Sequence, residues 1–291
     1  MNAGKIYLSP KNDLIFKLIF GSQKNIEILI GFLQSVLDLP ANEYDHIELV
    51  NTHLQPEMIG DKEGILDIKL HTKNKNIIDI EIQVKTVPDM RERVVFYASK
   101  MITEQIKRGE IYNKIKRAIS IVITNFRLIN DSESYHNRYR LYDKKTGSQF
   151  TDVIEICILE LIKLPEENDE SDLWDWLKFI NSESEEECKV IADRNPQIKK
   201  AVRIVTEMSM DDSLRYRMES LEKAEHDEIS RLKGAKKDGI KVGRELGFRA
   251  GEIKKTREIA RNLKKKDLPS ETIAAVTGLS QKEIESLIQQ T

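Results

Sequence analysis

The chain has 291 residues, of which 40% are hydrophobic and 33% are charged, a balance typical of a globular protein with well-solvated helices. No stretch approaches the roughly 18–20 consecutive apolar residues that a membrane span requires, and two cysteines make neither a disulfide framework nor a zinc pattern. These features exclude a disulfide-rich secreted domain and, because no signal-peptide core follows the N-terminus, predict a cytoplasmic protein with reduced cysteines.

Charge is distributed unevenly along the chain. The net charge is −2, yet residues 231–291 contain 15 Lys and Arg against 8 Asp and Glu, and the preceding part holds 32 against 41. A basic tail on an acidic body is suited to contact with nucleic acid at the tail. A solvated helix without a partner fits the charge equally well.

The first 165 residues contain the patterns of a mixed α and β fold. Apolar residues at helical spacing predict two helices, NDLIFKLIFG and NIEILIGFLQSVLDL, and a third, MRERVVFYASKMITEQIKRG, after Pro88. Strand patterns lie at 47–54, 65–71, 77–85, 118–126 and 152–161. This order predicts an α/β or α+β fold, in which helices flank a central mixed sheet.

Composition divides the rest of the chain into two further parts. We expect a core at 1–165, an acidic linker with a helical extension at 166–233, and a basic C-terminal region at 234–291. Trp174 and Trp176, in the acidic part, are expected to dock on the core.

Residues 234–291 carry two patterns of their own. Glycines at every fourth position, among Lys and Arg, favour a helix that two backbones can approach closely, possibly in self-association, over a basic linker: Gly239, Gly243, Gly247 and Gly251. The tail predicts two short helices, the first capped by Ser270 and the second by a capping box of Ser280 and Glu283. Such a unit resembles a helix-turn-helix, which reads DNA, but a small helical hairpin that packs on protein is slightly favoured.

The polar residues of the hairpin at 65–85 hold the candidate chemistry. If residue 72 pairs with 76, Asp67 lies opposite Glu81, with Cβ atoms roughly 4.5–5.5 Å apart. If 73 pairs with 77, Asp67 faces Gln83 and lies diagonal to Glu81. A loop with 72 opposite 77 would put the two acids on opposite faces of the sheet.

Two carboxylates held this close repel each other, so that a cation is expected between them. Mg²⁺ prefers oxygen ligands and often uses only one or two carboxylates beside substrate phosphates. Gln83 would orient the attacking water and Lys85 would neutralise phosphate. Asp79, nearer the turn, is expected to face solvent. Alternation alone, however, is more typical of a plain solvated sheet surface.

The run Asp67 … Glu81-Ile82-Gln83 ahead of a helix resembles the PD-(D/E)XK nuclease superfamily in an E-x-Q variant. More closely, the chain resembles the Rpn family of recombination-promoting nucleases, also called PD-(D/E)XK-family transposases. The similarity covers most of the chain, in order: SPKNDLIFKLIFG, LDIKL, IDIEIQVK, RVVFYASKM, QIKRGEIYNKIKRAISIVITNF, the glycine-spaced tract and IARNL…TGLSQKEIESL.

This resemblance implies a restriction-endonuclease-like core and assigns roles to its residues. Asp67 and Glu81 would be the metal-binding acids, and Gln83 stands where the superfamily usually has lysine. Lys85 is the candidate that would supply the missing positive charge. Asp13 is a candidate for an additional acid, or a helix N-terminal residue favoured by the dipole. Arg93 and Tyr97 could contact DNA phosphate or pack on the surface.

The leading hypothesis is therefore a Mg²⁺-dependent DNA endonuclease, with Mn²⁺ as a substitute ion, that is transposase-like and promotes recombination. The expected partners are DNA and a second copy of the chain, with no membrane and no organic cofactor. A non-catalytic DNA-binding or assembly protein that keeps the nuclease fold is the alternative. A protein-interaction module built on the tail is a third hypothesis.

Overall fold

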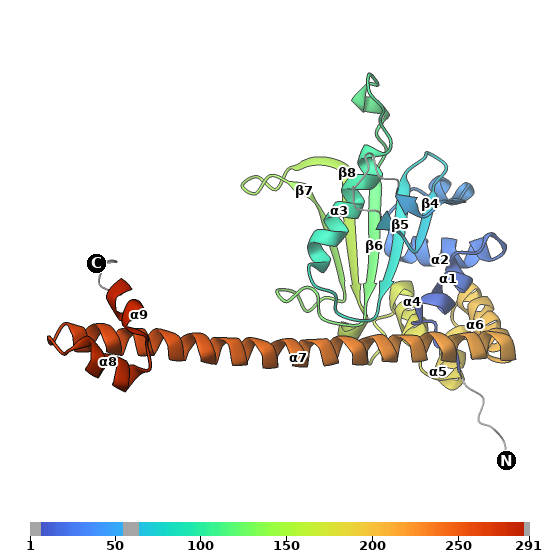
Figure 1. The fold of residues 1–291 in the computed structure, drawn as a ribbon. Coiled ribbons are helices and arrows are strands. Elements are labelled where there is room, and N and C mark those ends of the chain that lie inside the picture. The colour runs from blue at the N-terminus through green and yellow to red at the C-terminus, as the bar shows by residue number, and fades with distance from the viewer. Residues whose placement is uncertain (1–6, 55–63, 288–291) are drawn as a thin grey trace, which may run out of the picture. The chain divides into compact units, whose positions relative to one another are not determined.

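The computed structural model describes residues 7–54 and 64–287 (Figure 1). Contacts divide the chain into two compact units, Met1–Arg215 and Tyr216–Thr291. The boundaries at 165 and 233 stay a prediction, and the first residues, on which the absence of a signal peptide was inferred, lie outside the described part. No helix of that part is long and apolar enough to cross a membrane.

A six-stranded mixed sheet forms the centre of the first unit. Its order is β1-β4-β5-β6-β8-β7, in which β5, β6 and β8 run parallel and the other three strands pair antiparallel with their neighbours. The strands are β1 Glu48–Val50, β4 Ile68–His71, β5 Ile77–Gln83, β6 Ala118–Thr124, β7 His136–Tyr142 and β8 Gln149–Glu160. The predicted mixed sheet is thus confirmed.

Two details of the strand prediction and one of the helix prediction are wrong. The predicted strands 47–54 and 65–71 are each interrupted, because β2 (His53–Leu54) and β3 (Gly64–Ile65) pair as a separate two-stranded sheet. The predicted loop between the last two strands contains β7, an edge strand of mostly polar, partly exposed residues. The third predicted helix ends at Thr103, before its predicted end at Gly109.

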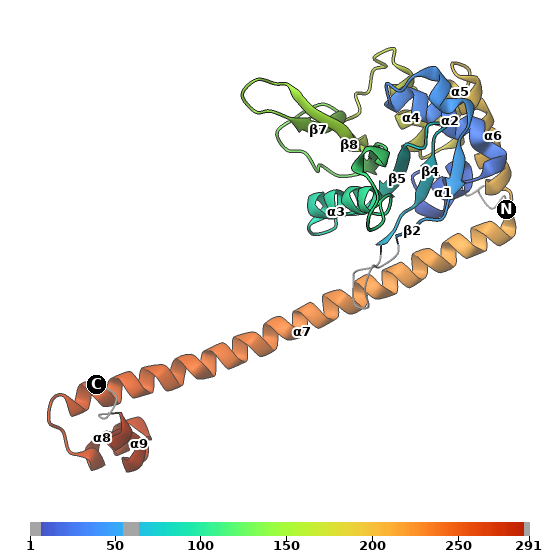
Figure 2. The same cartoon turned by 90° about the horizontal axis from the view of Figure 1, so that it is seen from above.

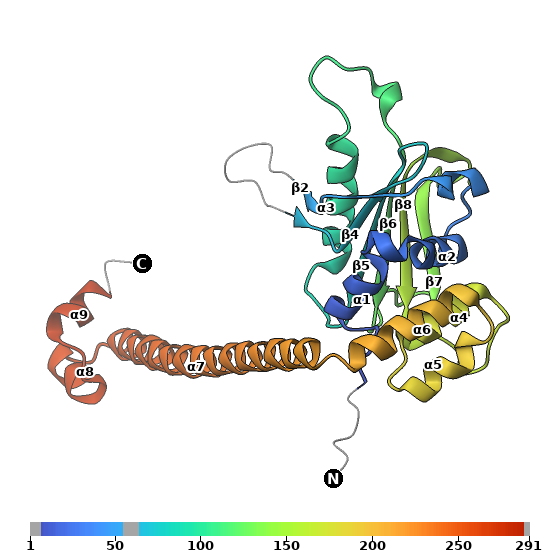
Figure 3. The same ribbon diagram turned by 90° about the vertical axis from the view of Figure 1, so that its right-hand side faces the viewer.

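Helices cover both faces of the sheet (Figures 2 and 3). On one face α3 (Met90–Thr103) packs through Met90 and Val94 on Val122 and Ile158. The opposite face lies against α1 (Asp13–Phe20) and α2 (Ile26–Val36), with α4 (Asp172–Ile180), α5 (Glu185–Ala192) and α6 (Pro196–Ser209) beyond them. The sheet therefore has no solvated face over its central strands, and its polar residues there are buried.

An aromatic cluster joins the acidic segment to the core. The Trp176 ring lies 5.9 Å from that of Phe20 and 6.0 Å from that of Phe32, and Trp174 is also buried. Both tryptophans dock as predicted, because α4 presents its apolar face to α2.

The basic region continues a single long helix. Residues Asp212–Lys264 form α7, 53 residues long, so that the glycine-spaced tract is helical, as favoured. Two short helices follow, α8 (Ser270–Thr277) and α9 (Gln281–Ser286), and pack through Ile273 and Ile284 on Ala260.

Capping of the two short helices was predicted correctly only for the second. The capping box of Ser280 and Glu283 is present at the start of α9. The prediction that Ser270 caps α8 is wrong: Pro269 holds the cap position, and the Ser270 hydroxyl instead accepts a hydrogen bond from Lys264. The proline ends the preceding turn, so that the serine becomes the first helical residue.

Candidate functional site

The register of the β4–β5 hairpin brings the two predicted acids together. Ile68 pairs with Ile80 and Lys69 with Asp79, and the Thr72 amide donates to the Asn76 carbonyl at 3.0 Å. Asp67 directly precedes β4, and the same register continued by one residue places it opposite Glu81. This is the first of the three predicted registers, and it excludes the other two.

Asp67 lies just ahead of β4 and is tied to both flanking elements. Its Oδ2 accepts a hydrogen bond from the Ile82 amide at 3.1 Å, and its Oδ1 lies 2.9 Å from Lys17 Nζ of α1. Burial raises the pKa of the Asp67 carboxyl, against the hydrogen bond from Lys17, which lowers it. The carboxylate is thus anchored at the ends of the two strands, with one cation beside it.

Glu81 occupies the interior of β5 with only 3% of its surface exposed. Its Oε1 lies 2.5 Å from Arg93 Nη2 of α3. Burial raises the pKa of Glu81 to about 7. The positive charge of Arg93 lowers this pKa, and the negative charge of Asp67 raises it again. Two facing acids therefore share this site, each paired with one basic side chain from a different helix.

Asp79 is buried, and the prediction that it faces solvent is wrong. It is 1% exposed, because α3, which packs on β6 and β8, reaches over the hairpin through Arg93 to Glu81 and through Tyr97 and Met101 beside Leu66 and Ile77. Among the described residues its Oδ1 has no hydrogen-bond partner, nor has the Oγ of Ser120, its neighbour in β6. Burial raises the pKa of Asp79 well above its usual range, and the nearby Glu81 raises it further.

Gln83 and Lys85 lie where β5 ends. Gln83 is the last residue of the strand, and its Nε2 donates to the Lys85 carbonyl at 3.2 Å. The Lys85 side chain is exposed beyond the strand. The roles predicted for these two residues stay a prediction.

Two helices supply the remaining predicted residues. Asp13, at the start of α1, is largely exposed and lies 3.0 Å from Lys17. Tyr97 is buried beside Leu66, and the Arg93 guanidinium lies 5.2 Å from the centre of its ring. Packing, the alternative considered for Tyr97, therefore describes its environment, whereas Arg93 reaches the acids.

Lys17 is the residue at this site that the sequence analysis did not select. Its ammonium bridges Asp13, at 3.0 Å, and Asp67, at 2.9 Å. The sequence NDLIFK shows that Lys17 lies four residues after Asp13, but this spacing indicates only an ordinary ion pair along one helix. Only the packing of α1 against the sheet shows that Lys17 meets Asp67.

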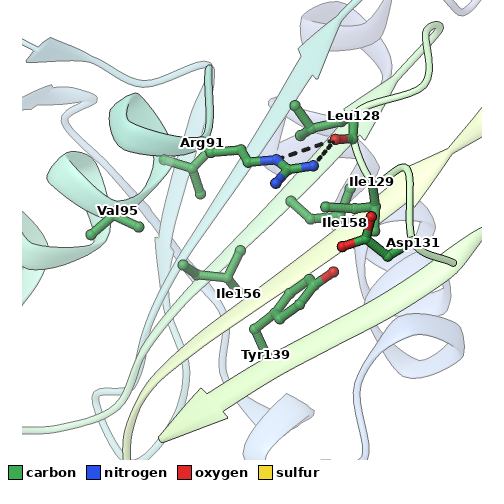
Figure 4. Close-up of a pocket in the computed structure, with 9 residues that line it drawn as sticks. Arg91, Val95, Leu128, Ile129, Asp131, Tyr139, Ile156 and Ile158 are labelled. Atoms are coloured by element: carbon green, nitrogen blue, oxygen red, sulfur yellow. Dashed lines mark hydrogen bonds between the residues drawn. The ribbon is translucent and has the colours of Figure 1, made fainter. Parts of the chain in front are cut away.

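A separate hollow of about 340 Å³ lies on the other flank of α3 (Figure 4). Arg91 closes one side of it by donating from both Nε and Nη2 to the Leu128 carbonyl. Its lining is mainly apolar and comes from α3, the loop after β6, β7 and β8: Val94, Val95, Leu128, Ile129, Ile156 and Ile158, with Arg91, Asp131 and Tyr139. None of the predicted acids lies in it, so that it is distinct from the predicted site.

The donors at the acid site fit a hard divalent cation. In the described residues no three His, Cys, Asp or Glu side chains are arranged to hold one metal ion. Mg²⁺, however, needs only one or two carboxylates, and keeps several waters. Asp67 and Glu81 would be its ligands, and the buried Asp79 beside them has an oxygen without a hydrogen-bond partner among the described residues.

A mixed six-stranded sheet flanked by helices, with facing acids on an antiparallel hairpin, is consistent with the PD-(D/E)XK nuclease fold. A family model described as "PD-(D/E)XK nuclease family transposase" matches residues 10–235, and the chain belongs to that family. Nucleases of this class typically use a divalent metal ion. No curated protein and no solved structure was found to match the chain.

Proposed function

We propose that the chain is a divalent-metal-dependent DNA endonuclease that hydrolyses phosphodiester bonds, transposase-like in its family and promoting recombination. The observation that carries the proposal is that Asp67, next to the end of the β4–β5 ladder, accepts a hydrogen bond from the Ile82 amide and lies close to the buried Glu81, whose pKa it raises. Mg²⁺ is the proposed ion, with Mn²⁺ as a substitute.

The proposed chemistry is the addition of water to phosphorus. One bond forms between the water oxygen and phosphorus, one P–O bond to a sugar breaks, and the proton released by water is balanced by one taken up by the sugar oxygen. A bound divalent ion would supply charge neutralisation and a more acidic water. Asp67 and Glu81 would hold that ion, Gln83 would orient the water, and Arg93 would hold Glu81 in place.

Cleavage of supercoiled plasmid DNA tests this function. The wild-type chain should nick or linearise the plasmid with Mg²⁺ or Mn²⁺ and should leave it intact in EDTA. Asp67→Ala and Glu81→Ala should abolish cleavage, whereas Asp45→Ala, which removes an exposed acid paired with Lys73, should not. If both site variants cut like the wild type, the site assignment is wrong.

A non-catalytic DNA-binding or assembly protein is the second proposal. It is favoured by Gln83, which carries no charge, and by the basic partners that both acids already have. Salt-sensitive DNA binding without cleavage, with any divalent ion, would select this function over the first.

Self-association through α7 is the form of assembly that we propose. Leu232, Leu246 and Ile253 lie on a seven-residue repeat with Gly239 and are 55%, 61% and 53% exposed. A repeat of seven residues keeps these positions near one face of the helix, and no atom lies within 4 Å of a Cβ added at the glycines of this tract. Light scattering of the full chain should give a dimer, which Leu246→Glu should weaken more than Ile240→Glu on another face of the helix.

A further inference from the structure

Lys17 is held at the acid site by the apolar face of its own helix. Asn12 caps α1 by accepting hydrogen bonds from the amides of Leu14 and Ile15. The helix then buries four side chains completely: Ile15, Phe16, Ile19 and Phe20. Because α1 is anchored in this way, the position of the Lys17 backbone beside Asp67 is fixed, while its four-carbon side chain keeps several rotamers.

The two basic side chains of the site differ in how firmly they are held. Arg93 is engaged by Glu81 and lies over the Tyr97 ring. Lys17 contacts Asp67 and the largely exposed Asp13, and 36% of its own side chain is exposed. Of the two, Lys17 therefore has the freedom to change partners at the rim of the site.

A divalent ion bound by Asp67 and Glu81 would take over the carboxylate that Lys17 now neutralises. Two cations on one carboxylate repel each other, so that the ammonium would leave Asp67 and keep Asp13, its other partner at 3.0 Å. When DNA is bound, a phosphate would add a new negative group for the ammonium at the rim of the site. A lysine side chain is long enough to cover the few ångströms between a carboxylate and a phosphate that share one ion.

We propose that Lys17 is a catalytic residue, whose ammonium neutralises Asp67 in the metal-free protein and contacts a phosphate oxygen when ion and DNA are bound. It would thereby supply the positive charge that Gln83 cannot, a role that the sequence alone assigned to Lys85. This inference rests on the proposed nuclease function and names one of its residues.

The exchange has two consequences of opposite sign for Lys17→Met. DNA cleavage should fall about 10²- to 10³-fold, the usual cost of one charged or hydrogen-bonding group that meets the reacting centre. Binding of Mn²⁺ without DNA should become several-fold tighter, because the competing ammonium is gone. A purely structural lysine would instead weaken both properties through loss of the fold.

The experiment uses the full-length chain and two measurements. Single-turnover nicking of plasmid DNA gives the cleavage rate, and the electron paramagnetic resonance signal of free Mn²⁺ gives the affinity for the ion alone. The variants are Lys17→Met, Lys85→Met and Lys24→Met, the last removing an exposed lysine seven residues from Lys17. A fourth variant combines Lys17→Met with Gln83→Lys and should recover at least tenfold of the lost rate.

The outcomes distinguish a failure of the role proposed for Lys17 from a failure of the proposed nuclease function. Slower cleavage with tighter Mn²⁺ binding, in Lys17→Met alone, supports the proposal, and rescue by Gln83→Lys strengthens it. Wild-type cleavage that Lys17→Met leaves unchanged, or that only Lys85→Met impairs, overturns the role of Lys17 and leaves the nuclease function standing. A wild-type chain that never cleaves overturns the nuclease function, and unchanged Mn²⁺ affinity in Lys17→Met overturns the exchange independently.

Discussion

Glu81 and Glu155 are two buried glutamates of one sheet with opposite electrostatic surroundings. Glu81 in β5 has one guanidinium partner, Arg93, and faces a second acid. Glu155 in β8 has a completely buried side chain with three guanidinium partners: Arg117 at 2.5 Å, Arg138 at 2.7 Å and Arg140 at 2.9 Å. Burial raises the pKa of both, but the arginines reverse this at Glu155, whose pKa is lowered, whereas that of Glu81 rises to about 7.

The difference separates a carboxylate that supports the fold from one that is available for chemistry. Three guanidinium groups hold Glu155 as an ionised group between β6, β7 and β8, although two of them also pair with an exposed acid, Arg117 with Asp152 and Arg138 with Asp38. At the acid site three acids, Asp67, Glu81 and Asp79, lie near three basic side chains, Lys17, Lys69 and Arg93, but Lys69 is itself paired with Glu104 and burial raises the pKa of all three acids. Such a site lowers the stability of the isolated chain and favours binding of a cation.

The largest expected effect concerns activity. Glu81→Gln should lower DNA cleavage about a thousandfold or more, equivalent to about 4 kcal/mol, because it removes an ion ligand while keeping the shape of the side chain. Glu155→Gln should cleave like the wild type when rates are compared per folded molecule. Equal losses in the two variants would mean that the contrast between these glutamates does not track function.

The free energy of unfolding should fall more in Glu155→Gln than in Glu81→Gln, the reverse of the order expected for activity. Glu155→Gln leaves three arginines without their shared anion and should lower the free energy of unfolding by about 3 kcal/mol. Urea denaturation at neutral pH and low salt measures this directly. A loss for Glu81→Gln as large as that for Glu155→Gln would contradict the comparison.

The sequence predicted the hairpin strands and the two acids of the site better than it predicted the side chains packed around them. Alternation in IIDIEIQVK showed which side chains of β5 share a face. The turn residues left three possible registers for the hairpin, and one of them is the observed register. Resemblance then selected Asp67 and Glu81. Both come from local pairing, in which chain neighbours decide geometry.

Sequence analysis did not predict the environments of Lys17, Asp79 and the arginines around Glu155, because tertiary packing decides them. A polar strand face indicates solvent unless a helix covers it, and nothing in the strand itself shows that α3 does so over Asp79. Likewise the sequence of β7 does not show which way the strand faces, since the side chains that face the sheet are Arg138 and Arg140, paired with Glu155, while Tyr139 and Leu141 are exposed. The sequence shows these charges, but not their partners 15 or more residues away.

The pH dependence of stability sharpens the contrast. The folded pKa of Glu155 lies below its usual value of 4.5, so that its contribution is fully present above pH about 4.5 and is lost as pH falls through the folded value. The difference in thermal midpoint between wild type and Glu155→Gln should therefore be constant from pH 8 to 5 and shrink at lower pH. A difference that grows on acidification would mean that Glu155 is protonated in the folded protein.

The smallest expected effect is a gain at Asp79. Its Oδ1 is buried without a partner among the described residues, and burial holds its pKa well above the usual range, so that folding at alkaline pH costs either a protonation or a buried charge. Asp79→Asn removes that cost while keeping the volume. In EDTA at pH 8 the variant should be more stable by about 1 kcal/mol, seen as a rise of about 2–4 °C in the thermal midpoint. Glu155→Gln under the same conditions should fall, so that the two substitutions, each of which neutralises one buried acid, shift stability in opposite directions. A lower midpoint for Asp79→Asn would show instead that the Asp79 charge is already compensated in the metal-free chain.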